Sequence, residues 1–430
     1  MALTPRAVWL ALLGLAPVLL RPTQSTVWLW VLLVVLLCAL DALLAPDPAR
    51  VRIDRGPDAR VRLGGTAHSE LWLTNDTPRR VRGLVRDAWP PSTGAVSDRH
   101  RLDLRTGERT RLVGRFVPTR RGDRTADRVT LRLLGPLRLA ARQSSRRVPG
   151  RIRALHPFGA RVHLPSRLAT LRQLDGRAAQ RTRGQGTEFD SLRDYVDGDD
   201  VRSLDWRATA RRQHPVVRTW RPEEHRRVVI VVDTSRTSAA RVGDHPRLDA
   251  QMDAALLLAA LAGHARDRVQ VIAGDRRVRA RVSGHDRATL LSSVVDALSD
   301  VEPTLVEADW TALATEVTRA SSQRALVVLL TALEPSVIEE GLMPVLPALT
   351  ARHRVVVASA ADPELARMSR TRESVKDVYG AAAAERTVQL RERSADALGR
   401  MGVTVLEEEP AALAPALADH YLALKARGLL

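Results

Sequence analysis

The chain has 430 residues, which is enough for two or three domains with sizeable cores. Its formal net charge of +18 comes almost entirely from arginine, because Lys376 and Lys425 are the only lysines, and aromatic residues make up 3%. We therefore expect no nucleic-acid-binding surface of basic residues interleaved with stacking rings, and the single cysteine, Cys38, argues against a disulfide or a thiolate metal site.

Two apolar runs open the chain, Ala7–Leu20 and Val27–Ala45, and Asp41 is the polar exception in the second. At about 1.5 Å per residue, the second run is long enough to cross a hydrocarbon core of ~30 Å. The first run is short and needs Arg6 to lie at the interface. A signal peptide is the alternative, but no small-residue cleavage site follows the first run. The sequence predicts a transmembrane helical hairpin over residues 1–46.

Arginines flank this hairpin unequally. Arg21 stands alone in the loop between the runs, whereas the outer ends carry Arg6, Arg50, Arg52, Arg55, Arg60 and Arg62. Because basic residues collect on the cytoplasmic side of a membrane, both ends are predicted to lie inside. The expected localisation is the plasma membrane, with two passes and the soluble domains facing the cytoplasm.

Residues 47–155 show a period of two. Apolar and polar residues alternate along 69–74, 81–88, 111–117 and 128–134, with Gly, Pro and Asn-Asp turns between the runs. Short alternating runs of this kind predict an all-β sandwich of immunoglobulin-like type. Arginines at alternate positions indicate a solvated outer face, which next to a membrane could also meet anionic lipid headgroups.

Residues 156–227 are interpreted as a connector that carries a dense group of unlike residues. Its most informative positions are Gly186, Glu188, Phe189, Leu192, Arg193, Tyr195, Gly198, Asp199, Arg202, Asp205, Trp206, Ala210 and Arg211. After them, 216–220 reads as an extended edge strand. The charged members either form a buried ion network that fixes the Trp206 segment or present a docking surface, and the residues alone favour neither.

This block resembles the signature of the bacterial family called Domain of Unknown Function 58, which reads roughly G-x-E-F-x-x-L-R-x-Y-x-x-G-D-x-x-R-x-I-D-W-x-x-x-A-R. Leu204 stands where that pattern usually has Ile. Members of the family are commonly encoded beside MoxR-type AAA+ ATPases. The resemblance therefore implies such an ATPase as partner.

Residues 228–430 alternate between strands and helices. Apolar runs predict strands at 228–232, 269–273, 325–330, 355–358 and 403–406, and helices at 248–266, 286–298, 309–320, 335–349, 381–401 and 411–426. The predicted helix at 335–349 is interrupted by Pro344 and Pro347. This order predicts a Rossmann-like α/β domain with a parallel sheet covered on both faces.

A polar loop follows the first of these strands. Asp233, Ser235 and Thr237 resemble the D-x-S-x-S metal loop of von Willebrand factor A domains, whose oxygens suit Mg²⁺. The same resemblance implies a threonine and an aspartate on two further loops, where this chain has Ala308 and Ala332. Asp309 and Thr331 are neighbours of those alanines, but adjacent strand residues point to opposite sides.

We therefore expect no cofactor, with Mg²⁺ the one candidate ion. The alternative role of Asp233 is to cap the next segment and hold its loop by hydrogen bonds. The chain has no H-E-x-x-H, no G-x-S-x-G and no P-loop, and its eleven histidines are scattered. No catalytic residue, nucleic acid or small-molecule substrate is expected.

The sequence predicts a membrane-anchored scaffold or adaptor that acts through protein–protein contacts, and the resemblance adds a chaperone-like or assembly role with a MoxR-type ATPase. Two alternatives remain at this stage. One is a metal-dependent adhesion module that binds an acidic residue of its partner. The other is a hydrolase that uses the carboxylates of Asp199 and Asp205.

Overall fold

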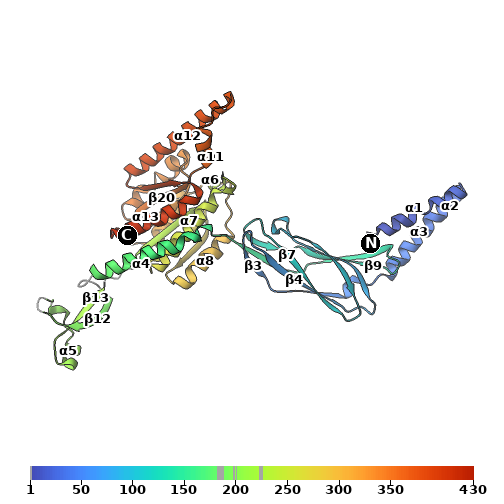
Figure 1. Cartoon of the computed structure of the whole chain (residues 1–430), viewed down its shortest axis with the longest axis horizontal. Coiled ribbons are helices and arrows are strands. Elements are labelled where there is room, and N and C mark those ends of the chain that lie inside the picture. Colours follow the sequence, from blue (N-terminus) through green and yellow to red (C-terminus); the bar gives the residue numbers. More distant parts are fainter. Residues whose placement is uncertain (1, 182–187, 197–198, 200, 222–225) are drawn as a thin grey trace. The chain divides into compact units, whose positions relative to one another are not determined.

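The computed structural model describes residues 2–181, 188–196, 199, 201–221 and 226–430. The chain divides into two compact units, Met1–Pro157 and Phe158–Leu430 (Figure 1). This division lies two residues from the predicted end of the strand-rich domain at 155. Each unit is described separately.

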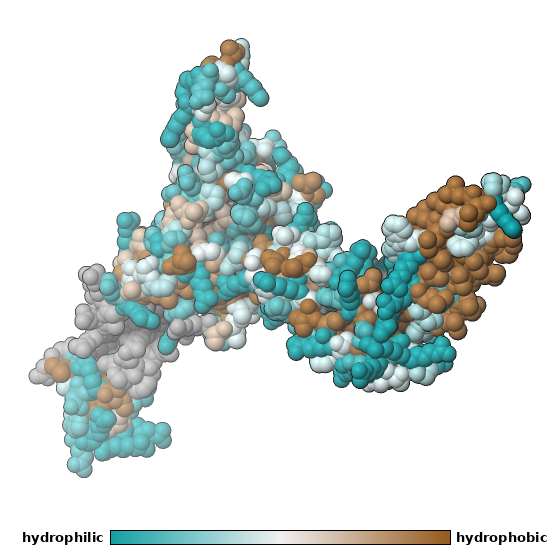
Figure 2. Space-filling view, turned by 45° about the vertical axis from the view of Figure 1, so that its right-hand side comes forward, coloured by the Kyte–Doolittle hydropathy of each residue, from teal (hydrophilic) through white to brown (hydrophobic). Residues whose placement is uncertain are grey.

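Three helices open the first unit: α1 (Pro5–Leu12), α2 (Leu15–Leu20) and α3 (Gln24–Leu44). Within the described residues, the segment Gln24–Arg50 is the one that is long and apolar enough to cross a membrane. The helices α1 and α2 are shorter and lie against α3, where the Trp30 Nε1 donates to the Leu10 carbonyl at 3.3 Å. Their hydrophobic surface is the large brown area of Figure 2.

Gly14, between α1 and α2, is required by this contact. A Cβ atom at this position would lie 2.2 Å from the Trp30 ring. The structure thus confirms an apolar helix near the N-terminus, α3, whereas the crossing of a membrane by α3 or by α1 and α2 stays a prediction.

The strands of the first unit are β1 (Ala2–Leu3), β2 (Val51–Arg55), β3 (Ala59–Arg62), β4 (Ala67–Asn75), β5 (Val81–Ala88), β6 (Arg99–Leu104), β7 (Arg109–Phe116), β8 (Gly122–Thr125), β9 (Arg128–Leu134), β10 (Ala140–Arg146) and β11 (Arg151–Leu155). They form sheets with the orders β1-β10-β9-β5-β6, β2-β4-β7 and β3-β11-β8. All four predicted runs are strands, and β5 and β9 have the predicted bounds.

The first two sheets share one core. Leu71 and Leu73 of β4 pack with Val85 of β5 and Leu131 of β9, and all four side chains are buried. Burial alternates along β5, as the period of two predicted. The chain therefore forms two sheets around one hydrophobic core, and the immunoglobulin-like topology stays a prediction.

Asp41, the polar exception in α3, is fully buried. Its carboxylate accepts three backbone hydrogen bonds from the turn between β9 and β10: Leu137 N at 2.7 Å, Leu139 N at 2.7 Å and Ala140 N at 2.8 Å. Thr4, just before α1, bonds to the same turn through the Arg138 and Leu139 carbonyls. One turn therefore holds both the start of α1 and the end of α3.

The second unit is built on six strands: β14 (Arg227–Asp233), β17 (Arg268–Gly274), β18 (Val278–Gly284), β19 (Leu326–Leu330), β20 (Arg354–Ala360) and β21 (Thr404–Glu408). Their order is β18-β17-β14-β19-β20-β21, and every pair is parallel except β17 with β18. The five predicted strands are confirmed, whereas β18 was not predicted. Counted within this sheet, the order is 3-2-1-4-5-6, that of a doubly wound sheet.

Its helices are α4 (Leu164–Arg181), α6 (Arg236–Ala239), α7 (Arg247–His264), α8 (Arg287–Ser299), α9 (Trp310–Ala320), α10 (Leu346–Thr350), α11 (Pro363–Met368), α12 (Val375–Arg400) and α13 (Pro410–Ala426), with a π-helical turn at Val337–Leu342 and a short hairpin of β15 (Arg241–Val242) and β16 (His245–Pro246). Val228, Ile230 and Val232 of β14 face a core with α7, α8 and α13. Val229 and Val231 face a second core with α9 and α10. The predicted two-sided coverage is confirmed.

The segment interpreted as a connector is more structured than predicted. In it, α4 packs on α7 and α13, Leu171 is buried, and Arg167 forms two hydrogen bonds with Asp419. The signature then forms its own hairpin, in which β12 (Glu188–Asp194) pairs antiparallel with β13 (Val216–Arg221) and α5 (Trp206–Arg212) follows a 3-10 turn at Val201–Ser203. The predicted strand at 216–220 exists, but it pairs with β12 and not with the parallel sheet.

Candidate functional site

Asp233 lies at the carboxyl end of β14, beside the end of β19. This is the point where the strand order of the sheet reverses, and ligands of doubly wound sheets bind at such switch points. The β-branched run of β14 ends here because the chain must leave the sheet, and Ser235 is the N-cap residue of the short helix α6. The predicted loop is therefore placed where this fold class builds its sites.

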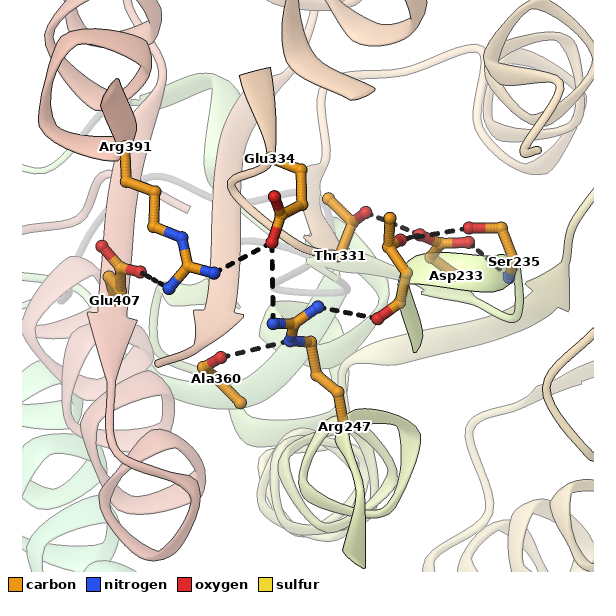
Figure 3. A network of polar contacts seen from close by, with 9 residues as sticks. Asp233, Ser235, Arg247, Thr331, Glu334, Ala360, Arg391 and Glu407 are labelled. Atoms are coloured by element: carbon orange, nitrogen blue, oxygen red, sulfur yellow. Dashed lines mark hydrogen bonds and ion pairs between the residues drawn. The ribbon is translucent and has the colours of Figure 1, made fainter. Parts of the chain in front are cut away.

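The Asp233 carboxylate is completely buried and accepts hydrogen bonds from two loops (Figure 3). Ser235 N donates to Oδ1 at 2.8 Å, Thr237 Oγ1 to Oδ2 at 3.3 Å and Thr331 Oγ1 to Oδ2 at 2.7 Å. The Ser235 and Thr237 hydroxyls also contact each other at 3.2 Å. The structure thus brings all three predicted loop residues together and adds Thr331 to them.

Burial raises the pKa of the Asp233 carboxyl, and the hydrogen bonds from Thr331, Ser235 and Thr237 oppose that rise. Removing water disfavours the charged form, whereas donors favour it. The arrangement can hold a loop closed by hydrogen bonds, and its oxygens are also of the kind that a hard cation prefers. The first role is the capping role that the sequence offered as the alternative to metal binding.

The expectation that Thr331 points away from Asp233 is wrong. It applied the alternation of side chains to a residue that follows the last residue of β19, Leu330, where the strand has already ended. Ala332 is buried, Ala308 packs against the second core, and Asp309 caps α9 by accepting from Ala312 N at 2.9 Å. None of these three contributes an oxygen to the Asp233 cluster.

A second polar cluster adjoins the first along the same edge of the sheet, and sequence reasoning missed it (Figure 3). Arg247, at the start of α7, is buried and donates to the Thr237 carbonyl at 2.7 Å and the Ala360 carbonyl at 3.3 Å. It also pairs with Glu334 at 3.9 Å. Thr237 therefore links the two clusters, because its hydroxyl binds Asp233 and its carbonyl binds Arg247.

Arg391 of α12 extends this cluster toward β21. It lies 2.9 Å from Glu334 and 3.8 Å from Glu407. Burial raises the pKa of Glu407, and Arg391 and Arg247 offset only part of that rise. These residues are far apart in the sequence and form no motif, so no signal in the sequence could have grouped them.

On the other side of Asp233, Asp275 follows β17 and is also buried. It accepts hydrogen bonds from Thr304 Oγ1 at 2.8 Å, Arg279 Nε at 2.8 Å and Thr234 Oγ1 at 3.1 Å. Burial acts to raise the pKa of Asp275, but Thr304, Arg279 and the Arg277 amide together outweigh burial, and the net shift is downward. Within the described residues, no group of three or more His, Cys, Asp or Glu side chains could hold a metal ion.

The signature hairpin is organised by two arginine–carboxylate pairs. Arg193 holds Asp199 with two hydrogen bonds of 2.7 and 2.5 Å, and Arg218 donates to Asp205 at 2.8 Å. Asp205 also caps α5 through Arg207 N and Ala208 N, both at 3.0 Å. The Arg193 bond lowers the pKa of Asp199, and the Ala208 amide followed by Arg218 lowers that of Asp205.

A buried ion network was one of the two alternatives for these charged residues, but both described pairs lie at the surface. The arginine side chains of the two pairs are 45% and 46% exposed, and the Trp206 side chain is 69% exposed. Trp206 begins the helix α5 of this hairpin, so the structure does not show a buried network that fixes the Trp206 segment in the interior. Val196 and Val201, in the same hairpin segment, are also exposed.

The remaining signature positions are distributed over this hairpin. Glu188 and Phe189 lie on β12, Arg202 on the 3-10 turn and exposed Arg211 on α5, while Tyr195 bonds through its backbone N to the Pro215 carbonyl at 2.9 Å. Gly186 and Gly198 lie outside the described residues.

A pocket of about 570 Å³ opens at the opposite, amino edge of the parallel sheet beside Arg227 and Arg268, and contains none of the predicted site residues.

Comparison with known proteins identifies relatives of the segment that contains the signature hairpin and the Asp233 loop. A profile of the family described as "Protein of unknown function DUF58" matches residues 191–395. Uncharacterized proteins of Mycobacterium tuberculosis and Mycobacterium bovis are 28% identical to the chain over 189 residues, 42% of this chain and 56% of each relative. These matches support a protein of the DUF58 family.

The chain spans about half the length of the curated relatives it matches. Among solved structures, a CARDB domain from Pyrococcus furiosus aligns at 16% identity over 25% of this chain and 96% of that one, with a TM-score of 0.18. That similarity is too low to support a statement about fold. The DUF58 match includes Arg193, Asp199, Asp205 and Trp206, and it extends over the Asp233 loop.

Proposed function

We propose that the protein is a membrane-anchored scaffold or adaptor that binds partner proteins in the cytoplasm, and that a MoxR-type AAA+ ATPase is one of them. The observation that carries this proposal is the exposure of Trp206 at 69% in a hairpin that two ion pairs hold in shape. Exposed tryptophan and arginine side chains are the residue types that dominate binding energy at interfaces. Of the two hypotheses for the signature, a buried ion network and a docking surface, the exposure of Trp206 favours the docking surface.

The finer fold assignment is part of this proposal. A strand order of 3-2-1-4-5-6 with an antiparallel edge strand, and the Asp233–Ser235–Thr237 loop at its switch point, support a von Willebrand factor A-like domain. The two sheets around one core support an immunoglobulin-like sandwich. The resemblance of the Asp233 loop to von Willebrand factor A domains also implies a MoxR-type ATPase as partner, because such domains are recurrent partners of these ATPases.

The anchor is proposed to cross the membrane twice, with α1 and α2 as one pass and α3 as the other. The exposed apolar side chains of these helices and the arginines beyond their inner ends support it. Asp41 supports it as well, since its charge is bound by protein amides and does not face lipid.

One observation favours the adhesion-module alternative. The Thr331 hydroxyl adds a second loop to the oxygens around Asp233, which the sequence had not predicted. The hydrolase alternative gains no such support, because Asp199 and Asp205 are each bound to an arginine and have lowered pKa values.

The test is co-purification of the full chain with a MoxR-type ATPase encoded in the same genome. We expect a complex that Trp206→Ala weakens at least tenfold, because interface tryptophans often contribute 2 kcal/mol or more, by the order of magnitude of alanine scans. Tyr379→Ala, a change at a residue that is 76% exposed on α12, is the matched control and should leave binding unchanged. Equal binding by both variants would reject the hairpin as the docking surface.

A further inference from the structure

A pocket of about 230 Å³ opens at the base of α3, and arginines line it. Arg79, Arg80 and Arg82 come from the start of β5 and the residues before it, and Arg138 comes from the turn between β9 and β10. Leu44 and Pro46, at the end of α3, form the apolar side. Basic and apolar walls thus meet at one opening.

Positive charge exceeds negative charge in this pocket. Asp103 pairs with both Arg80, at 2.6 Å, and Arg82, at 3.5 Å. No ion pair is described for Arg79 or Arg138 within the part of the chain that the structure covers. Asp41 lies behind the turn at Gly135, but its carboxylate is buried and bound by three amides. Two guanidinium groups are therefore available to an anion.

The surroundings of the pocket favour a lipid over a soluble anion. Above it, the surface of α3 is apolar and exposed, with Leu40, Leu43 and Leu44 at 49%, 73% and 41%. In Figure 2 the hydrophobic surface of the helices ends against the hydrophilic surface of the sandwich. A molecule with a charged head and long acyl chains matches both surfaces at once. Juxtamembrane arginines of this kind attract anionic lipids.

We propose that this pocket binds the phosphate-bearing headgroup of an anionic phospholipid, with Arg79 and Arg138 on the phosphate and the acyl chains along α3. The proposal rests on the anchoring of α3 in a bilayer. It assigns a ligand to a specific site on the sandwich, whereas alternating surface arginines alone would give only a diffuse attraction. The turn that contains Arg138 is the one that Asp41 and Thr4 hold, so the site is fixed to the membrane helices.

The test uses the full chain in nanodiscs that contain phosphatidylcholine with a minor fraction of labelled phosphatidylglycerol, and measures lipid retained on the protein. We expect phosphatidylglycerol to be enriched, and the double variant Arg79→Gln/Arg138→Gln to lower its affinity about thirty-fold. Arg115→Gln/Arg120→Gln is the matched control. It removes the same charge from exposed arginines at the opposite end of β4 and β7, and should retain full enrichment.

The double variant Arg79→Lys/Arg138→Lys keeps the charge and should recover most of the binding, which separates headgroup recognition from misfolding. Equal enrichment in the Gln variant and the control would overturn the proposal. So would binding of free glycerol phosphate as tight as that of the lipid, since this would make the pocket a site for a soluble anion. Failure of the chain to enter nanodiscs would reject the anchor as well, whereas entry without enrichment rejects the lipid site alone.

Discussion

At the scale of single residues, Asp233 has an unusual environment. Its buried carboxylate accepts hydrogen bonds from a backbone amide and two hydroxyls, all of them neutral donors. Neutral donors compensate a buried charge less completely than an arginine does. Burial consequently raises its pKa, which makes the stability of this unit depend on pH in a direction opposite to that of ordinary surface carboxylates.

We predict that Asp233→Asn gains stability relative to the parent protein as pH rises. In the unfolded chain an aspartate titrates near pH 3.9, by the usual reference value. Because burial raises the pKa of Asp233 in the folded protein, its carboxyl adds its full share to the stability below about pH 3.9. That stabilisation is lost as the pH rises through the pKa of the folded state. Asn keeps similar hydrogen bonds and does not titrate. The melting temperature of both proteins between about pH 4 and pH 8 tests this.

Asp286→Asn is the control, because its effect on stability should change with pH in the opposite direction. Asp286 caps α8, and the Ala288 amide lowers its pKa, so its contribution is present above the unfolded value and is lost on acidification. The parent should therefore lose its advantage over Asp286→Asn as pH falls. If the difference between Asp233→Asn and the parent is the same at every pH, the raised pKa of Asp233 is refuted.

We also predict that Mg²⁺ and Mn²⁺ at millimolar concentration do not raise the melting temperature of the second unit. Asp233 is the one carboxylate among the four clustered residues, and its oxygens are already bound by donors. Binding at a hundred times the dissociation constant would add about 2.7 kcal/mol, which calorimetry detects easily. A metal-dependent rise that disappears in Asp233→Ala would instead favour the adhesion module.

Two tryptophans that each begin a helix should respond differently to truncation. Trp206 is 69% exposed, whereas Trp310, the first residue of α9, is 4% exposed in the second core. We expect Trp206→Ala to change the free energy of unfolding by about 0.5 kcal/mol or less, and Trp310→Ala to lower it by ~3–5 kcal/mol. Urea unfolding measures both. A large loss in Trp206→Ala would mean that the hairpin packs against the domain.

At the scale of elements, Asp41 connects α3 to the β9–β10 turn. We predict that Asp41→Ala increases hydrogen exchange at the amides of Leu137, Leu139 and Ala140, because each loses a charge-assisted bond that is worth about 1.5–3 kcal/mol. Leu40→Ala, a change at the neighbouring residue that is 49% exposed, should leave these amides protected. Unchanged exchange in Asp41→Ala would show that other contacts hold the turn.

Most elements were predictable because their apolar spacing is local. The run 228–232 predicted β14, and the period of two gave β5 and β9 their bounds. The edge strand β18 was missed although Val278, Ala280 and Val282 alternate with arginines, because its outer face is exposed and its inner face only partly buried. The role of α4 was missed because its burial depends on α7 and α13, far along the chain.

The site was predictable to a smaller extent. The position of Asp233 after a buried strand follows from the fold class, whereas the contact with Thr331 and the Arg247–Glu334–Arg391 cluster depend on the neighbourhood of strands. The exposure of Trp206 was not readable from the sequence either. An aromatic residue within a dense motif is compatible both with a core and with an exposed position on a hairpin.

At the scale of the whole molecule, the proposed anchor predicts the side of the membrane. A reporter fused after Leu430 that is active only outside the cytoplasm should stay inactive, and a cytoplasmic reporter at the same position should be active. The arginine excess beyond the inner ends of the helices is the physical reason. Activity of the outside reporter would remove the compartment on which the adaptor proposal depends.

The bonds of Asp41 also set an order of events during synthesis. Its three amide partners lie 96, 98 and 99 residues further along the chain. At about 5–20 residues per second, the ribosome needs roughly 5–20 s to make them after Asp41 has been added. Throughout that interval the carboxylate has to remain hydrated near the exit of the ribosome or the insertion machinery. The C-terminal end of α3 therefore reaches its final position only after most of the sandwich has been translated.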